Sequence, residues 1–260
     1  MSVHGTNPPR LRSTFSFGRI ASQSTSSQFN IGYTQLSASG LNAYWLGGEP
    51  AQAINTPGRT MQLSAKRAVD ILASLFALIL FGPLLLLVTI GIKLADPGPA
   101  LFRQPRVGLD GRPFTIYKFR SMYLNKCSDD GVAQTVSDDA RIMPFGAFLR
   151  RTSIDELPQL LNVILGDMSL VGPRPHVQGQ LAAGEPYAAA VPYYNYRWAM
   201  RPGLTGWAQA NGYRGPTDEM SAARARVDHD IAYIQNFSLA LDIRIILLTL
   251  RREFLRGTGF

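Results

Sequence analysis

The chain has 260 residues, a formal net charge of +8 at pH 7 and a pI of about 9.9. This basic balance suits anionic lipid headgroups or nucleotide phosphates, while the lack of zinc-finger spacing and of a basic-aromatic RNA signature argues against a nucleic-acid partner. The single cysteine, Cys127, excludes an internal disulfide and is typical of a reducing compartment. The N-terminus lacks the pattern of a secretory signal, so we expect the soluble part to be cytoplasmic.

The first segment, residues 1–62, is rich in Ser, Thr, Gln, Asn and Gly and contains no Lys or Asp. It shows no apolar periodicity. Such a segment buries too little apolar surface to offset the entropy of an ordered chain. We therefore predict a disordered tail over residues 1–62.

A long apolar segment follows at residues 63–95, with an uncharged run from Ile71 to Ile92. At about 1.5 Å per residue this run is long enough to cross a bilayer core about 30 Å thick. Gly82-Pro83 interrupts its centre, and a proline there removes a backbone hydrogen bond and clashes with the preceding turn. Basic residues flank both ends, so the positive-inside rule drives neither end across the membrane. A kinked membrane span and a helix that returns at mid-membrane both fit these features.

Two β-like runs come next and meet at Asp110-Gly111, a dipeptide suited to the positive φ values of a tight hairpin. In the second run, a period of two places Lys118 and Arg120 on one face with two apolar residues. These cations are either solvated strand positions or half of an anion clamp. The clamp requires further basic residues to converge on the same place.

The sequence RRTSIDELPQ places two adjacent carboxylates at the start of an apolar helical pattern. Ser153 and Glu156 fit a capping box, which is the purely structural explanation. That explanation leaves out Asp155 and conflicts with Pro158, whereas a helix that starts at Pro158 moves both carboxylates into the preceding turn. In either register, free helix amides favour their ionised forms. An ionised Asp can attack phosphorus, and a neighbouring carboxylate can hold Mg²⁺.

Three further arginines are candidates for contacts with phosphate. Arg150 directly precedes the carboxylate segment and can make bidentate contacts. Arg174 lies between two prolines, which restrain its backbone. It either belongs to a rigid loop with its side chain in solvent or recognises an oxyanion. Arg214 belongs to the glycine-rich stretch 201–215, where close backbone approach to a nucleotide is feasible, although such a loop is a weak signal alone.

The C-terminal stretch 237–260 has an apolar core of about ten residues, which is too short to span a bilayer. It is either an amphipathic helix at the membrane surface or a helix packed on the soluble domain.

Taken in order, the proline-interrupted helix, KFRSM, LRRTSIDELPQLLNVILGDMSLVGPRP and RPGLTGWAQANGYRG resemble the bacterial sugar transferase family, the small monotopic phosphoglycosyl transferases. The resemblance runs from about residue 64 to the end. It implies a mixed α/β, mainly helical fold with a small β-hairpin and interfacial amphipathic helices. It also implies a re-entrant membrane helix over residues 63–95, broken at Gly82 and Pro83 instead of the family's Ser-Pro pair, and a compact cytoplasmic catalytic domain over residues 96–260.

The same resemblance implies transfer of a hexose 1-phosphate from a UDP-sugar to polyprenyl (undecaprenyl) phosphate at the bacterial inner membrane, with release of UMP. Asp155 matches the family's nucleophile and Glu156 its magnesium ligand. The family's substrate-binding cations match Lys118, Arg120, Arg150, Arg174 and Arg214. The GWAQANGYRG form looks most like members that prime exopolysaccharide synthesis with galactose or glucose phosphate. The sequence fixes neither the sugar nor the oligomeric state, and a homodimer is compatible with it.

Two other functions fit parts of the sequence. Asp228-His229-Asp230 could serve as the metal motif of a glycosyltransferase that releases UDP, although solvated acidic residues on a polar helix explain it more simply. A non-catalytic membrane scaffold for polysaccharide assembly would use only the basic surface and the tail.

Overall fold

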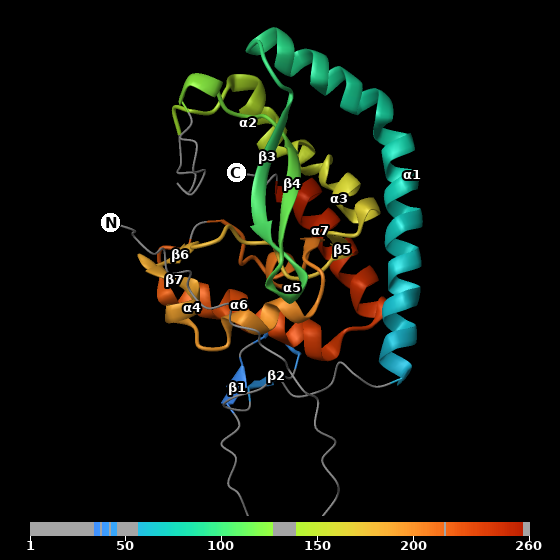
Figure 1. Ribbon diagram of the computed structural model, residues 1–260, viewed down its shortest axis with the longest axis vertical. Coiled ribbons are helices and arrows are strands. Elements are labelled where there is room, and N and C mark those ends of the chain that lie inside the picture. Colours follow the sequence, from blue (N-terminus) through green and yellow to red (C-terminus); the bar gives the residue numbers. More distant parts are fainter. Residues whose placement is uncertain are drawn as a thin grey trace, which may run out of the picture. The chain divides into compact units, whose positions relative to one another are not determined.

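A computed structural model of the chain describes residues 34–36, 38–41, 43–45, 57–126, 139–215 and 217–256. All of them belong to one compact unit, Gly32–Phe260. The described residues form a mixed α/β, mainly helical fold, as predicted, and their strands make small two-stranded sheets (Figure 1).

The helices in this part of the chain are α1 Pro57–Ala95, α2 Pro144–Arg151, α3 Gln159–Leu165, α4 Tyr187–Ala190, α5 Trp207–Ala210, α6 Met220–Asn236 and α7 Leu239–Arg256. Short 3₁₀ turns lie at Leu109–Gly111, Leu124–Lys126, Ile154–Glu156 and Tyr194–Ala199. The strands pair as β1 Thr34–Leu36 with β2 Ala43–Trp45, β3 Leu101–Val107 with β4 Pro113–Phe119, β5 Ser169–Val171 with β8 Gly203–Thr205, and β6 Leu181–Ala182 with β7 Glu185–Pro186.

Helix α1 carries the apolar segment and runs 39 residues with Pro83 inside it. It begins six residues earlier than the predicted membrane segment. The predicted break at Gly82-Pro83 takes the form of a bend within a continuous helix, because helical backbone resumes on both sides of the missing donor. Figure 1 shows this change of direction in the later half of α1.

The middle of α1 exposes its apolar side chains, and among the described residues α1 is the one helix long and apolar enough to cross a membrane. Its large exposed side chains include Leu72, Phe76, Ile79, Leu86, Leu87 and Leu94. Both ends of the helix, in contrast, pack on the rest of the domain. Lys66 and Asp70 are buried near its start, and Val88 and Ile92 are buried near its end against Met143 and Leu149.

A buried polar network fixes the start of α1. Lys66 Nζ lies 2.7 Å from Asp242 Oδ2 of α7, and Tyr233 of α6 donates its hydroxyl to Asp242 Oδ1 at 2.7 Å. Asp70 accepts a hydrogen bond from Ser169 Oγ of β5 at 2.7 Å. Removing one partner of such a buried ion pair costs about 3–5 kcal/mol, because the other charge stays buried without compensation. The network therefore fixes the position of the start of α1 on the domain.

The β3–β4 hairpin forms as predicted, with Leu101 opposite Phe119 and Val107 opposite Pro113. Asp110 and Gly111 adopt φ values of 55° and 74°, the left-handed conformation that their residue types favour. Asn162 of α3 holds β4 from the side: its Oδ1 accepts from Tyr117 N at 3.0 Å, and its Nδ2 donates to Thr115 O at 2.6 Å. This contact places β4 beside the segment that carries the adjacent carboxylates.

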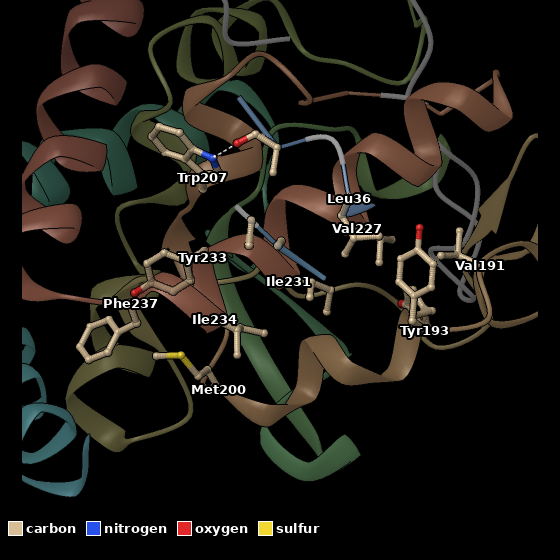
Figure 2. Packing of buried hydrophobic residues seen from close by; sticks show 14 of the residues in the cluster. Leu36, Val191, Tyr193, Met200, Trp207, Val227, Ile231, Tyr233, Ile234 and Phe237 are labelled. Atoms are coloured by element: carbon tan, nitrogen blue, oxygen red, sulfur yellow. Dashed lines mark hydrogen bonds between the residues drawn. The ribbon is translucent and has the colours of Figure 1, made fainter. Parts of the chain in front are cut away.

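The main hydrophobic core gathers around α6, with Trp207 of α5, Tyr233 of α6 and Met200 before β8 (Figure 2). Helix α7 buries Leu241 and Ile245 in the same core but leaves Ile243, Leu247 and Leu250 exposed on its other side. The two alternatives for the C-terminal stretch are therefore not exclusive: α7 packs on the domain and also presents an apolar stripe.

The predicted tail differs from the structure at its described residues. β1, β2 and the first turns of α1 lie within residues 1–62, and Leu36, Ala38 and Ala43 are buried in the main core. The strands are too short for a periodic pattern, and their apolar side chains pack onto α6. The rest of the predicted tail, and Cys127, lie outside the described residues.

Candidate active site

The carboxylate segment lies between α2 and α3. Ser153 adopts a left-handed conformation at φ 54° and makes no side-chain capping bond, so the predicted capping box is wrong. A 3₁₀ turn, Ile154–Glu156, carries both carboxylates, and α3 begins at Gln159 directly after Pro158. The alternative register, in which the carboxylates precede the helix, is therefore the one that forms.

Glu156 is buried at the centre of a cluster of cations. Lys118 Nζ lies 2.8 Å and Arg174 Nη2 2.6 Å from Glu156 Oε1, and Arg214 Nη2 lies 3.8 Å from Oε2. Burial alone would raise the pKa of Glu156, but Arg174, Lys118 and Arg214 outweigh it and hold this pKa well below its ordinary value. Glu156 is therefore ionised and organises three cations from three separate elements.

Asp155 is as buried as Glu156 but has different contacts. Its side chain takes part in no hydrogen bond or ion pair with the described residues. Burial and the neighbouring charge of Glu156 raise the pKa of Asp155 to about 6, against the opposing effect of Lys118, Arg150 and Arg214. With this pKa, Asp155 is predominantly ionised near pH 7, and its carboxylate has no hydrogen-bond or ion-pair partner among the residues that the structure describes.

The structure brings together three of the five predicted substrate-binding cations. Lys118, Arg174 and Arg214 converge on Glu156. Arg150 donates to Ser121 Oγ at 3.4 Å and lies close enough to Asp155 to lower its pKa.

Arg120 points elsewhere. Its Nη1 lies 2.7 Å from Asp96 Oδ2, and its Nη2 donates to the Asp96 carbonyl. A period of two placed Arg120 on the same strand face as Lys118, but β4 ends at Phe119, and Asp96 just after α1 takes the guanidinium. Arg120 therefore ties α1 to the hairpin and does not join the cluster on Glu156.

Two arginines near this cluster were not predicted as site residues. Arg106 of β3 donates to Gln104 Oε1 at 2.6 Å and to the Pro175 carbonyl at 3.4 Å, and burial followed by repulsion from Arg174 lowers its pKa to about 10. Arg197 donates to the Arg174 carbonyl at 2.7 Å. The hairpin pairing could have pointed to Arg106. It lies directly opposite Phe114, and residues directly opposite in an antiparallel pair share a face, so Arg106 lies on the same face as Lys118.

The Asp228-His229-Asp230 motif does not gather into a metal site. Asp228 accepts from Tyr193 Oη at 2.6 Å, and Asp230 forms a buried ion pair with Arg197 at 2.7 Å. No group of three or more His, Cys, Asp or Glu side chains is arranged to hold a metal anywhere in the described ranges. The geometry thus gives no support to a glycosyltransferase metal motif here.

Comparisons with known proteins agree with the predicted resemblance. The family model described as "Bacterial sugar transferase" matches residues 61–256. The chain is 54% identical over 200 residues to the exopolysaccharide production protein PSS of Rhizobium leguminosarum bv. phaseoli, which covers 77% of this chain and all of that protein.

Several relatives have names that state an activity, most of them transfer of glucose 1-phosphate. The UDP-glucose:undecaprenyl-phosphate glucose-1-phosphate transferase of Caulobacter vibrioides is 52% identical over 186 residues, which are 71% of this chain and 67% of that protein. The UDP-N-acetylgalactosamine-undecaprenyl-phosphate N-acetylgalactosaminephosphotransferase of Aeromonas hydrophila is 46% identical over 196 residues, which are 75% of this chain and 44% of that protein. The chain thus spans less than half of the second enzyme. With both the match over residues 61–256 and the full coverage of PSS, this chain belongs to the bacterial sugar transferase family.

Proposed function

We propose that this protein transfers a hexose 1-phosphate from a UDP-sugar to undecaprenyl phosphate and releases UMP, as the priming step of exopolysaccharide synthesis. The observation that carries this proposal is the pair Asp155 and Glu156: Glu156 gathers three cations, and Asp155 pairs with none of the described residues. An unpaired, ionised carboxylate is what a phosphorus nucleophile requires. The names of the relatives support the same class of reaction.

In the first step, an Asp155 oxygen attacks the β-phosphorus of the UDP-sugar. A bond forms between that oxygen and phosphorus, and the bond from the β-phosphorus to the bridging oxygen breaks, leaving its electron pair on UMP. In the second step, a phosphate oxygen of the polyprenyl phosphate attacks the same phosphorus and releases Asp155 as a carboxylate. Two displacements of this kind need no external oxidant or reductant.

The cations that contact Glu156 supply charge for the incoming diphosphate. Lys118, Arg174 and Arg214 each carry a donor within 4.0 Å of the Glu156 carboxylate, so they already point at one place before the substrate arrives. Such preorganisation stabilises charge that develops on phosphate oxygens without a reorganisation cost during the reaction. Arg150 adds a further positive charge on the Asp155 side.

Mg²⁺ is compatible with this donor set. The ion takes one or two carboxylates and completes its shell with substrate phosphates and water. Glu156 would be its carboxylate ligand, in exchange for one of the cations that it now contacts. When bound, Mg²⁺ would supply Lewis-acid stabilisation of negative charge on the diphosphate.

The packing of α1 supports a re-entrant membrane helix, and we propose that the domain lies on the cytoplasmic face of the inner membrane. Lys66 and Asp70 near its start and Val88 and Ile92 near its end all pack on the same domain. A soluble domain lies on one side of the bilayer, so both ends of the helix belong to that side and the exposed apolar middle enters the lipid. Soluble UDP-sugar and lipid-bound acceptor then meet at the membrane surface.

The transferred sugar is proposed at the level of a hexose, with glucose and galactose favoured. Several relatives are named for glucose, but one named for N-acetylgalactosamine is similar to this chain at a comparable identity, 46% against 52% for the glucose enzyme of Caulobacter vibrioides. Epimers differ at a single hydroxyl, so the sugar has to be identified by assaying the protein with a panel of UDP-sugars.

Asp155→Asn should abolish UMP release from UDP-sugar and polyprenyl phosphate, with a loss of at least about 10³-fold, because a carboxamide cannot form the phosphosugar-enzyme. Asp110→Asn is the matched control: Asp110 is exposed, and asparagine tolerates its φ of 55°, so its activity should equal wild type. Full UMP release by Asp155→Asn would reject Asp155 as the nucleophile, and UDP as the product would favour the glycosyltransferase. Unchanged polysaccharide production in cells that carry Asp155→Asn would favour the scaffold.

The value of kcat/KM for the first step should fall as pH drops through about 6, because the pKa of Asp155 is raised to about that value and only its ionised form attacks. Glu156 stays ionised across this range, since its pKa is held well below normal. In Glu156→Gln the residual activity should show its inflection at lower pH, because the like charge that raises the Asp155 pKa is gone. A flat profile between about pH 5 and 7, or an upward shift in Glu156→Gln, would reject the nucleophile assignment.

The re-entrant arrangement is tested by single cysteines at the two ends of α1. Met61→Cys and Leu94→Cys, made in a Cys127→Ser background, place thiols at positions that are 74% and 82% exposed. Both should resist a membrane-impermeant thiol reagent added to intact cells, and both should react once the membrane is permeabilised. Labelling of either one in intact cells identifies a helix that crosses the bilayer.

A further inference from the structure

The β1–β2 hairpin lies outside the family-matched residues 61–256, yet it is built into the domain. Leu36, Ala38 and Ala43 are 4%, 4% and 0% exposed and belong to the main core with Val227 and Ile231 of α6. Figure 2 shows Leu36 against Val227, with Trp207 at the other edge of the same cluster. The hairpin thus covers the face of α6 next to the glycine-rich stretch 201–215.

Two hydrogen bonds join the turn of this hairpin to that region. Trp207 Nε1 donates to the Ala38 carbonyl at 3.1 Å (Figure 2). Ser39 Oγ lies 2.7 Å from His229 Nε2, and His229 Nδ1 lies 2.7 Å from the Ala225 carbonyl. A carbonyl only accepts, so Nδ1 carries the proton, and in the neutral ring Nε2 accepts from the Ser39 hydroxyl. Burial lowers the pKa of His229, which is consistent with a neutral ring.

From His229 the contacts continue to the loop that carries Arg214. The His229 and Tyr213 rings pack at a centroid distance of 4.6 Å. Arg226 donates to the carbonyl of Tyr213 at 3.1 Å and to that of Gly215 at 2.7 Å, so the backbone is held on both sides of Arg214. Arg214 Nη2 in turn donates to Ser153 Oγ at 3.1 Å and lies 3.8 Å from Glu156 Oε2.

We propose that the β1–β2 hairpin is a positioning element of the active site, in which Ser39 orients His229 and, through Tyr213, sets Arg214 for binding of the UDP-sugar. This inference rests on the proposed function, in which Arg214 contacts the donor diphosphate. Ser39 itself touches no reacting group. Its loss should therefore weaken donor binding and leave the chemical step at Asp155 nearly unchanged.

Ser39→Gly removes the hydroxyl without straining the backbone, because Ser39 has a φ of 47° that glycine adopts readily. We expect KM for the UDP-sugar to rise about fivefold, the scale of one lost hydrogen bond, with kcat within about twofold of wild type. Ser39→Asn is the rescue variant, since asparagine tolerates this φ and keeps a donor. Its KM should return to within about twofold of wild type.

A double-mutant cycle with Arg214→Ala separates positioning from a merely structural role. If Ser39 acts through Arg214, Ser39→Gly should raise KM no further in the Arg214→Ala background. An unchanged KM in Ser39→Gly, an equal fivefold rise in both backgrounds, or a loss in kcat without a change in KM would each overturn the proposal. A wild-type protein that turns over no UDP-sugar would instead reject the proposed function, and the positioning role with it.

Discussion

Three cations from three elements contact the Glu156 carboxylate, whereas the neighbouring Asp155 carboxylate forms no ion pair or hydrogen bond within the described part of the chain. Two adjacent buried carboxylates cannot both be ionised in the same surroundings without a large cost in free energy, so the site gives them different surroundings. Glu156 takes the compensating charge, and Asp155 keeps a raised pKa of about 6 and an ionised form at neutral pH. Each of the three cations comes from a different part of the chain: the β3–β4 hairpin, the loop around Arg174 and the glycine-rich stretch 201–215. The 3₁₀ turn before α3 makes these different surroundings possible by holding both side chains outside a regular helix.

The attachment of α1 couples this centre to the membrane. Lys66, Asp242 and Tyr233 form a buried polar network where the helix enters the domain, and Arg120 pairs with Asp96 where it leaves. Buried charges of this kind contribute less to net stability than to a unique geometry, because each is costly to leave unpaired. With both attachments in place, the exposed apolar middle of α1 has a fixed relation to Asp155. A lipid-linked phosphate would then reach the same phosphorus as the soluble donor.

The sequence predicted features that local residue chemistry determines. Asp110-Gly111 requires positive φ, so the β3–β4 turn was readable, and the resemblance pointed to Lys118, Arg174 and Arg214, which converge on Glu156. Features that depend on competition between distant partners were missed. Spacing alone favoured a capping box at Ser153, but the left-handed backbone there turns its hydroxyl toward Arg214. The resemblance assigned Arg120 to the site, and its ion pair with Asp96, which is distant in sequence, could not be predicted from the strand pattern. The β1–β2 hairpin was not predicted because its few apolar residues are buried only by packing against α6, which is distant in sequence.

The proposed mechanism requires that Asp155 becomes covalently attached to the sugar phosphate. The most direct measurement incubates the protein with UDP-sugar and Mg²⁺ in the absence of polyprenyl phosphate, followed by mass spectrometry of the intact protein and its peptides. We expect one hexose phosphate on the peptide that contains Asp155, formed with a stoichiometric release of UMP and lost when polyprenyl phosphate is added. An enzyme that releases UMP only when both substrates are present, with no adduct on this peptide, would contradict the covalent mechanism.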